Sequence, residues 1–254
     1  MAGWLALPEG LELWVLILLL ATSFVASFIT AAFGIGGGGL LLAVMAALVP
    51  AAALIPVHGV VQLGSNAGRM LILLGRVFWP ALTWFAVGSL AGSVLGGLVV
   101  VELPAEIVQI GVGCFVIWTV FAKPPRWLRS WPLVTGAVSS FLTMFFGATG
   151  LFVASYTKSH QLPRHSHVAT HAALMTMQHG LKVVVFGLLG FVFAEWAGVI
   201  VAMILAGGFG TLAGRVVLNR IDDRRFRLAL DILLVLISLR LLWAGAEGLL
   251  AAAP

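Results

Sequence analysis

The sequence FGIGGGG, Phe33–Gly39, interrupts an apolar run that extends over residues 12–49. A helix cannot easily continue through it, because each glycine costs a helix about 1 kcal/mol relative to alanine. Three interpretations compete. Gly34, Gly36 and Gly39 fit the G-x-G-x-x-G pattern of a nucleotide loop. Alternatively, the glycines form a helix-packing patch, or they break the helix and expose backbone N–H groups to a ligand.

The composition places this break inside a membrane protein. The chain has 254 residues, of which 61% are hydrophobic and 9% charged, and its mean hydropathy is +1.13. Soluble domains carry roughly 25% charged residues. The apolar runs are too long for the strands of a barrel, so we expect an all-α, polytopic membrane helical bundle in contact with the lipid bilayer.

Three broad features narrow the class further. Cys114 is the one cysteine, which excludes an internal disulfide and a thiolate cluster. The net charge of +5 lies largely in short loops between apolar segments, so it indicates membrane orientation and no nucleic-acid partner. The N-terminal MAGWLALPEG lacks a basic region, and we expect the first segment to be retained.

A second glycine break, FGATG at Phe146–Gly150, lies 113 residues after the first. The same offset pairs other residues without a gap: Ser27 with Ser140, Thr30 with Thr143, Pro50 with Pro163, His58 with His171, Arg69 with Lys182, and Gly97 with Gly210. Chance is a poor explanation for aligned intramembrane histidines, cations and prolines. We predict two repeats, residues 1–122 and 131–254, joined by a cytoplasmic linker at 123–130.

The apolar segments are predicted at 12–49, 53–75, 79–101, 104–122, 131–157, 167–192, 196–217 and 228–250. The first and fifth contain the glycine breaks, and each is either a re-entrant hairpin or one discontinuous span. The hairpin alternative places nearly all loop arginines and lysines on one side of the membrane, as the positive-inside rule requires. It leaves three crossings in each repeat, so the repeats would be inverted. The basic loops would then be cytoplasmic, in a bacterial inner membrane.

Each break is expected to expose the N-terminus of a second half-helix, beginning near Leu40 and Leu151. The first N–H groups of a helix have no intrahelical partners, and the dipole is positive there, so such ends favour anions. Close packing is the competing explanation, as we expect for Gly88, Gly92 and Gly96. The duplication of the break favours a ligand site.

Polar residues follow one face of the second segment: His58, Gln62, Ser65, Asn66 and Arg69. The sixth segment carries His171, Gln178 and Lys182 on the equivalent face, with His167 and His179 at its margins. Such residues within a membrane usually line a pathway or pair with one another. The alternatives are that Arg69 extends to the interface and that the histidines bond neighbouring helices.

The remaining polar residues give weaker indications of a functional site. His160, His165 and His167 lack nearby carboxylates or cysteines, so we expect a loop and no metal site. Arg240 has no repeat partner and is as readily structural. No catalytic motif occurs, and no βαβ context supports a nucleotide loop, so we expect neither an enzyme nor a cofactor.

The stretches FGIGGGGLLLAVMAALVP (Phe33–Pro50) and ATHAALMTMQHGLKVVVFGLLGF (Ala169–Phe191) resemble the TauE/SafE-type sulfite exporter superfamily. That resemblance implies two related halves and the movement of sulfur-containing anions such as sulfite, thiosulfate or organosulfonates. The family motif carries onto Gly34, Gly36, Gly37, Gly38 and Pro50, and its degenerate second copy onto Gly147, Gly150 and Pro163.

We therefore predict a secondary transporter that exports a small sulfur-containing anion. The predicted binding residues are Gly34, Gly36, Gly37, Gly38, His58, Gln62, Asn66, Arg69, Gly147, Gly150, His171, Gln178 and Lys182. A coupled proton, carried by His58 or His171, is expected because the spans hold few acidic residues for a sodium site. The alternatives are an anion channel, a transporter for an unrelated small carboxylate, and a membrane assembly or sensor subunit. The sequence leaves the oligomeric state open.

Overall fold

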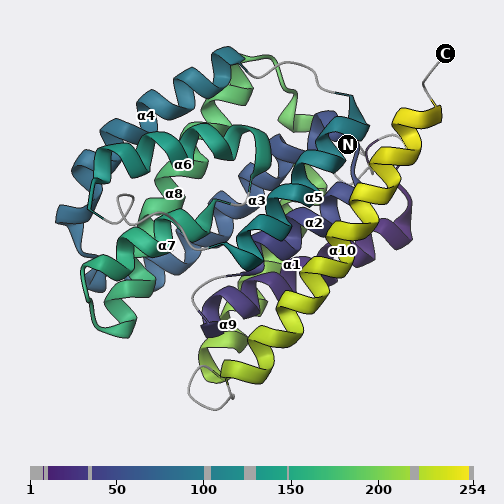
Figure 1. Ribbon diagram of the computed structural model, residues 1–254. Coiled ribbons are helices and arrows are strands. Elements are labelled where there is room, and N and C mark those ends of the chain that lie inside the picture. The colour runs from purple at the N-terminus through teal and green to yellow at the C-terminus, as the bar shows by residue number, and fades with distance from the viewer. Residues whose placement is uncertain are drawn as a thin grey trace.

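The computed structural model is a bundle of helices (Figure 1). It describes residues 8, 11–33, 36–99, 104–122, 130–147, 149–217 and 223–251, without the side chains of 217, 223–227, 229 and 230. The first half contains α1 (Leu13–Phe33), α2 (Gly37–Leu48), α3 (Ala51–Ile72), α4 (Leu82–Val99) and α5 (Ala105–Phe121). The second half contains α6 (Pro132–Phe146), α7 (Gly150–Ser159), α8 (Arg164–Leu188), α9 (Ala197–Val217) and α10 (Asp223–Ala251). Short 3₁₀ turns, η1 (Leu74–Arg76), η2 (Trp79–Ala81) and η4 (Phe193–Trp196), precede α4 and α9.

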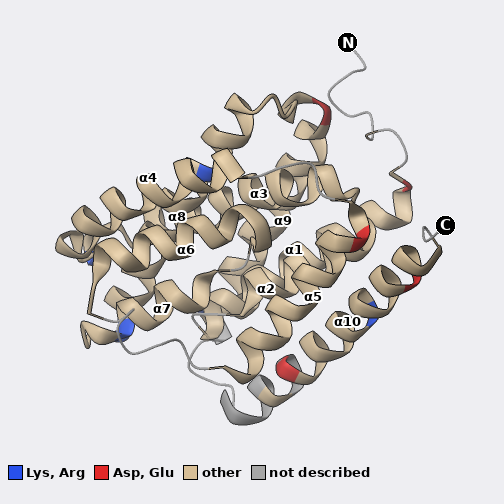
Figure 2. Ribbon diagram, turned by 45° about the horizontal axis from the view of Figure 1, so that its top comes forward, with Lys and Arg blue, Asp and Glu red and all other residues tan. Residues whose placement is uncertain are grey.

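The described part of the chain has no strands, and the expectation of an all-α membrane bundle is confirmed. Within the residues that the structure describes, four helical stretches are long and apolar enough to cross a bilayer: Leu13–Phe33, Trp79–Val99, Phe193–Val216 and Asp231–Ala251. The polar α3 and α8 have 22 and 25 residues, which corresponds to more than about 30 Å of helix. Figure 2 shows how few charged residues interrupt these helices. The protein is a multi-pass membrane protein.

At the first glycine break, α2 packs back against the end of α1. A Cβ at Gly37 would overlap the carbonyl oxygen of Ala26 and the hydroxyl of Thr30, so only glycine permits this approach. Gly36 has a φ of 108°, in the left-handed region that favours glycine. The break therefore combines a turn that needs glycine with a contact that needs glycine.

The longest interfaces join helices from different halves of the chain: α4 packs along α6, and α1 packs along α9. Glycines lie at both seams. A Cβ at Gly92 would overlap the carbonyl of Ala137, and one at Gly210 would overlap the carbonyl of Phe24. Phe24 and Ala137 are 113 residues apart, as the duplication requires, so the two seams are built from equivalent positions.

In these seams Gly210 occupies the position equivalent to Gly92. A fixed offset of 113 would instead pair Gly210 with Gly97. Three residues of this change arise in α8, which ends at Leu188, three residues later than α3 extended by 113 would end. The equivalence thus holds through α3 and α8 and then shifts. The seams support two repeats, and the domain boundaries and the inversion stay predictions.

The centre of the bundle is the α3–α8 pair, which α10, α5 and α2 flank on one side (Figure 1). Both helices begin directly after a proline, Pro50 and Pro163, whose fixed φ suits the position before a helix. This pairing brings the two polar faces that the sequence indicates toward one another.

Candidate functional site

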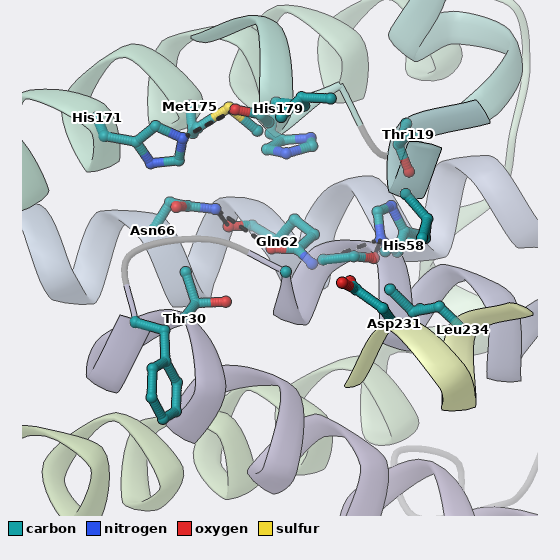
Figure 3. A pocket seen from close by; sticks show the side chains of 18 residues that line it. Thr30, His58, Gln62, Asn66, Thr119, His171, Met175, His179, Asp231 and Leu234 are labelled. Atoms are coloured by element: carbon teal, nitrogen blue, oxygen red, sulfur yellow. Dashed lines mark hydrogen bonds between the residues drawn. The ribbon is translucent and has the colours of Figure 1, made fainter. Parts of the chain in front are cut away.

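A cavity of about 230 Å³ lies between the two glycine breaks and the central helices (Figure 3). Its walls come from α1, α2, α3, α5, α7, α8 and α10. The lining residues are Thr30, Phe33, Gly36, Gly38, Gly39, His58, Gln62, Asn66, Thr119, Val120, Gly147, Gly150, Leu151, His171, Met175, His179, Asp231 and Leu234. Segments far apart in the sequence thus enclose one space.

The structure brings most of the predicted binding residues to this cavity. Those that line it are Gly36, Gly38, His58, Gln62, Asn66, Gly147, Gly150 and His171. Four do not line it: Gly37, Arg69, Gln178 and Lys182. Gly34 lies outside the described residues, as does most of the linker at 123–130. Whether any of these residues binds substrate stays a prediction.

The half-helices α2 and α7 both direct their N-terminal turns at the cavity. Gly38 and Gly39 of α2 line it, as do Gly150 and Leu151 of α7. Gly36 and Thr149, which directly precede the two helices, make no side-chain capping hydrogen bond, and the first N–H groups of a helix have no intrahelical partner. The two positive dipole ends therefore converge on one space.

His58 lies between the two breaks. Its Nε2–H donates to the carbonyl of Gly38, 3.2 Å away. Its Nδ1 faces Gly147, since a Cβ there would lie 3.1 Å from that nitrogen. Nδ1 is buried and has no hydrogen-bond partner among the described residues. One imidazole thus touches the first break and directs a vacant nitrogen at the second.

A polar line continues along α3, as Figure 3 shows. Gln62 Nε2 lies 3.4 Å from His58 Nε2, and Asn66 Nδ2 donates to the Gln62 carbonyl at 2.8 Å. Arg69 then donates from its NH1 to Asn66 Oδ1 at 3.0 Å and from its NH2 to Ser65 Oγ at 3.2 Å. Arg69 is buried and reaches the cavity only through Asn66.

The facing helix α8 supplies two histidines. His171 Nε2–H donates to the carbonyl of Gly150 at 3.2 Å, the counterpart of the His58 contact with Gly38. His179 meets His58 edge to face, with ring centroids 6.1 Å apart. Its Nδ1 is buried, and no described residue bonds to it. Imidazoles from both halves of the chain therefore meet at the cavity.

Gln178 is bonded away from the cavity. Its Nε2 donates to Ser140 Oγ at 3.1 Å, and its Oε1 accepts from Thr149 Oγ1 at 3.4 Å. At the equivalent place in the first half, Ser65 and Ser27 bond at 3.1 Å, and the offset of 113 maps this pair onto Gln178 and Ser140. In this structure Gln178 joins α6, α7 and α8.

Lys182 is fully buried, at 0% exposure, and its Nζ has no hydrogen-bond partner within the described ranges. The side chain crosses α3 at Gly59, where a Cβ would lie 2.7 Å from Lys182 Cε. Lys182 follows His179 by three residues, which makes the two neighbours on the helix surface. An unpaired ammonium behind the cavity wall is costly unless a negative charge comes close.

Several lining residues were not among the predicted binding residues: Thr30, Phe33, Thr119, Met175 and Asp231. His179 was placed only at the margin of the polar face. Asp231 is a lone acidic residue near the start of the last apolar segment, and that isolation was a signal for a functional position. Among the described residues, no three histidine, cysteine, aspartate or glutamate side chains cluster in a way that could hold a metal ion.

Comparison with known proteins gives one family. The family model described as "Sulfite exporter TauE/SafE" matches residues 19–241, which includes both glycine breaks and the central helices. A search of curated proteins and one of solved structures return no match. Because the match spans nearly the whole chain, the protein belongs to the sulfite exporter TauE/SafE family, a family of membrane transporters.

Proposed function

We propose that this protein exports a small sulfur-containing anion, such as sulfite, thiosulfate or an organosulfonate, through the cavity between the two glycine breaks. The observation that carries the proposal is the convergence of two half-helix N-termini, from α2 and α7, on one cavity. Backbone N–H groups and helix dipoles at such ends attract anions without requiring a charged side chain.

The donors around the cavity suit a compact oxyanion. The Gln62 amide and the His179 imidazole can each donate a hydrogen bond to a ligand in the cavity. The Nε2–H groups of His58 and His171 are held by the carbonyls of Gly38 and Gly150, so these two rings can donate to an anion only from Nδ1, as imidazolium. A pyramidal or tetrahedral anion has several acceptor oxygens that can be satisfied at once. The volume of about 230 Å³ leaves room for a short organic group beside a sulfonate.

Lys182 adds the charge that the cavity wall lacks. Its buried ammonium has no described partner, so an anion in the adjacent cavity would offset part of its desolvation cost. Asp231 opposes this, because its carboxylate lines the same cavity and repels an anion that comes close to it.

Proton coupling belongs to this proposal. His58 Nε2 must carry a proton to donate to the Gly38 carbonyl, so in the neutral imidazole Nδ1 is a bare acceptor. That nitrogen faces Gly147 and the cavity, where a proton could accompany the anion. Alternating access would follow if α2 and α7 shift relative to the α3–α8 pair and open the cavity to one side at a time.

The test is flux in proteoliposomes. Purified protein should move radiolabelled sulfite, thiosulfate or sulfoacetate with saturation, and an imposed pH gradient should change the initial rate. His58→Ala and Gln62→Ala should reduce transport at least tenfold, because the first removes the proposed proton carrier and the second removes a cavity donor. His160→Ala is the matched control, since His160 does not line the cavity.

The outcomes separate the competing functions. Flux that never saturates and ignores a pH gradient would indicate an anion channel. Saturable flux of a carboxylate with none of the sulfur anions would indicate the alternative substrate class. A protein that binds and moves none of these anions would favour an assembly or sensor subunit and would overturn the proposal.

A further inference from the structure

A second, separate pocket of about 40 Å³ lies next to the end of α1 and is framed by α3, α8 and α9. Four of its lining residues are basic: Arg69, Arg164, His165 and Arg215. None of its other described lining residues, such as Ala31, Val168 and Thr211, is acidic. We name these four residues and the space between them the arginine pocket.

The arginine pocket combines charges from both halves of the chain. Arg69 belongs to α3, whereas Arg164 begins α8 and Arg215 lies in the last turn of α9. Like charges that converge repel one another, and bringing them together costs free energy. A bound anion would relieve that repulsion.

Arg69 is the second, independent indication of a ligand. It is only 4% exposed, and its Nε has no hydrogen-bond partner among the described residues. NH1 and NH2 are held by Asn66 and Ser65, which fixes the guanidinium plane. A buried guanidinium that is held rigidly yet keeps a vacant donor at a pocket is suited to bind an oxyanion.

Arg164 and Arg215 complete the lining from the exposed side. Arg164 donates from its NH2 to the carbonyl of Ala32 at 3.2 Å, close to the first glycine break. The side chains of Arg164, His165 and Arg215 are exposed, so an anion can reach the pocket without a change in the fold. The same Asn66 that holds Arg69 lines the central cavity, so Arg69 lies between the two spaces.

We propose that the arginine pocket is a second anion site, specific for a small oxyanion, that lies one step outside the central cavity. Arg69, Arg164 and Arg215 would bind the oxygens, and Arg69 would connect the site with Asn66 and the cavity. The idea that this site loads the transported anion rests on the proposed function. The idea that it binds an oxyanion is independent of that function. The oxyanion could be a free sulfur anion or the phosphate of a lipid headgroup.

Calorimetry with sulfite, kept anaerobic, tests the site on the full chain in phosphatidylcholine nanodiscs. The wild type should show two binding steps. The double variant Arg164→Gln/Arg215→Gln should weaken one step at least tenfold and retain the other, because two charge-assisted contacts are lost. The matched control, Arg76→Gln/Lys158→Gln, removes the same charge from exposed residues outside the pocket and should keep both steps.

A second arm distinguishes the two sources of oxyanion. Nanodiscs containing phosphatidylglycerol should leave the second sulfite step intact if the ligand is soluble. If the headgroup occupies the pocket, this lipid should abolish the step, and native mass spectrometry should count more retained phosphatidylglycerol on the control than on the double variant. Either result supports an oxyanion site.

The proposal is overturned if the double variant and its control bind sulfite and phosphatidylglycerol equally. Gln62→Ala separates this result from a failure of the proposed function. If Gln62→Ala leaves both sulfite steps unchanged and the wild type moves no sulfur anion, the central proposal fails. The arginine pocket would still be supported in that case if the double variant loses one sulfite-binding step.

Discussion

His58 shows at the scale of one residue how the site depends on both halves of the chain. Its Nε2 bonds to Gly38 at the first break, and its Nδ1 faces Gly147 at the second. A larger residue at Gly147 would crowd the ring, because its Cβ would lie 3.1 Å from Nδ1, whereas the Gly38 contact is made by a backbone carbonyl. Gly147 therefore leaves room for the imidazole and also supplies the left-handed φ of 69° at its turn.

Lys182 gives the first prediction, in which stability and binding change in opposite directions. Lys182→Met should raise the melting temperature of the anion-free protein, because it removes a buried, unpaired charge. It should also weaken sulfite binding at least tenfold, because the attraction of the ammonium is lost. Thermal unfolding with and without sulfite measures both effects. Arg76→Met, at an exposed site, should change neither; a Lys182→Met protein that is less stable yet binds normally contradicts the account.

At the scale of elements, the first glycine break and the two seams between the halves of the chain depend on glycine for different reasons. Gly36 supplies a left-handed φ of 108°, whereas Gly37 lets α2 touch α1. Gly92 and Gly210 need no special φ and only permit two helices to approach. The sequence alone does not separate these roles, because both appear as a glycine in an apolar run.

Two adjacent glycines in α2 provide the second prediction. Gly37→Ala should lower the melting temperature, because its Cβ would overlap the Ala26 carbonyl and force the half-helices apart. Gly39→Ala should not lower it, since no atom lies within 4 Å of a Cβ there and alanine favours helix. Thermal unfolding in detergent compares the two variants. Equal losses of stability would show that α2 does not pack against α1 in this way.

A third prediction concerns the seam between α9 and α1. Gly210→Leu should destabilise the protein by about 1–3 kcal/mol or more, because the side chain meets the Phe24 backbone, which cannot move aside cheaply. Gly208→Leu, two residues away with open space around it, should leave stability and oligomeric state unchanged. Denaturation monitored by tryptophan fluorescence measures the difference. A stable Gly210→Leu protein would contradict the seam.

At the scale of the whole molecule, the sequence predicts the helical class and eight of the eighteen cavity-lining residues, but not the facing of α8. The offset of 113 transfers the polar face of α3 onto α8 and so selects Gln178 and Lys182. In the structure His171, Met175 and His179 face the cavity, while the amide of Gln178 bonds to Ser140 and Thr149. A polar stripe on a buried helix is wider than the cavity it borders, and only tertiary packing decides which edge faces inward.

Membrane orientation supplies the fourth prediction. Inverted repeats would place Arg76, after α3, and Glu195, after α8, on opposite sides of the membrane. After replacement of Cys114 by alanine, Arg76→Cys should react with an impermeant maleimide only from the cytoplasmic side, and Glu195→Cys only from the other. Both residues lie in short turns before the next span. Labelling of both cysteines from the same side would contradict the inverted repeats. It would not contradict the description of the cavity.

The central claim is that an anion binds between the N-termini of α2 and α7. A crystal structure with selenite in place of sulfite tests it most directly, because selenium can be located by anomalous scattering. The account predicts a selenium peak in the central cavity, within hydrogen-bond reach of the N–H groups at Gly38 or Gly150 and of His58 or Gln62. Selenite that is transported but bound away from both half-helix ends would contradict it.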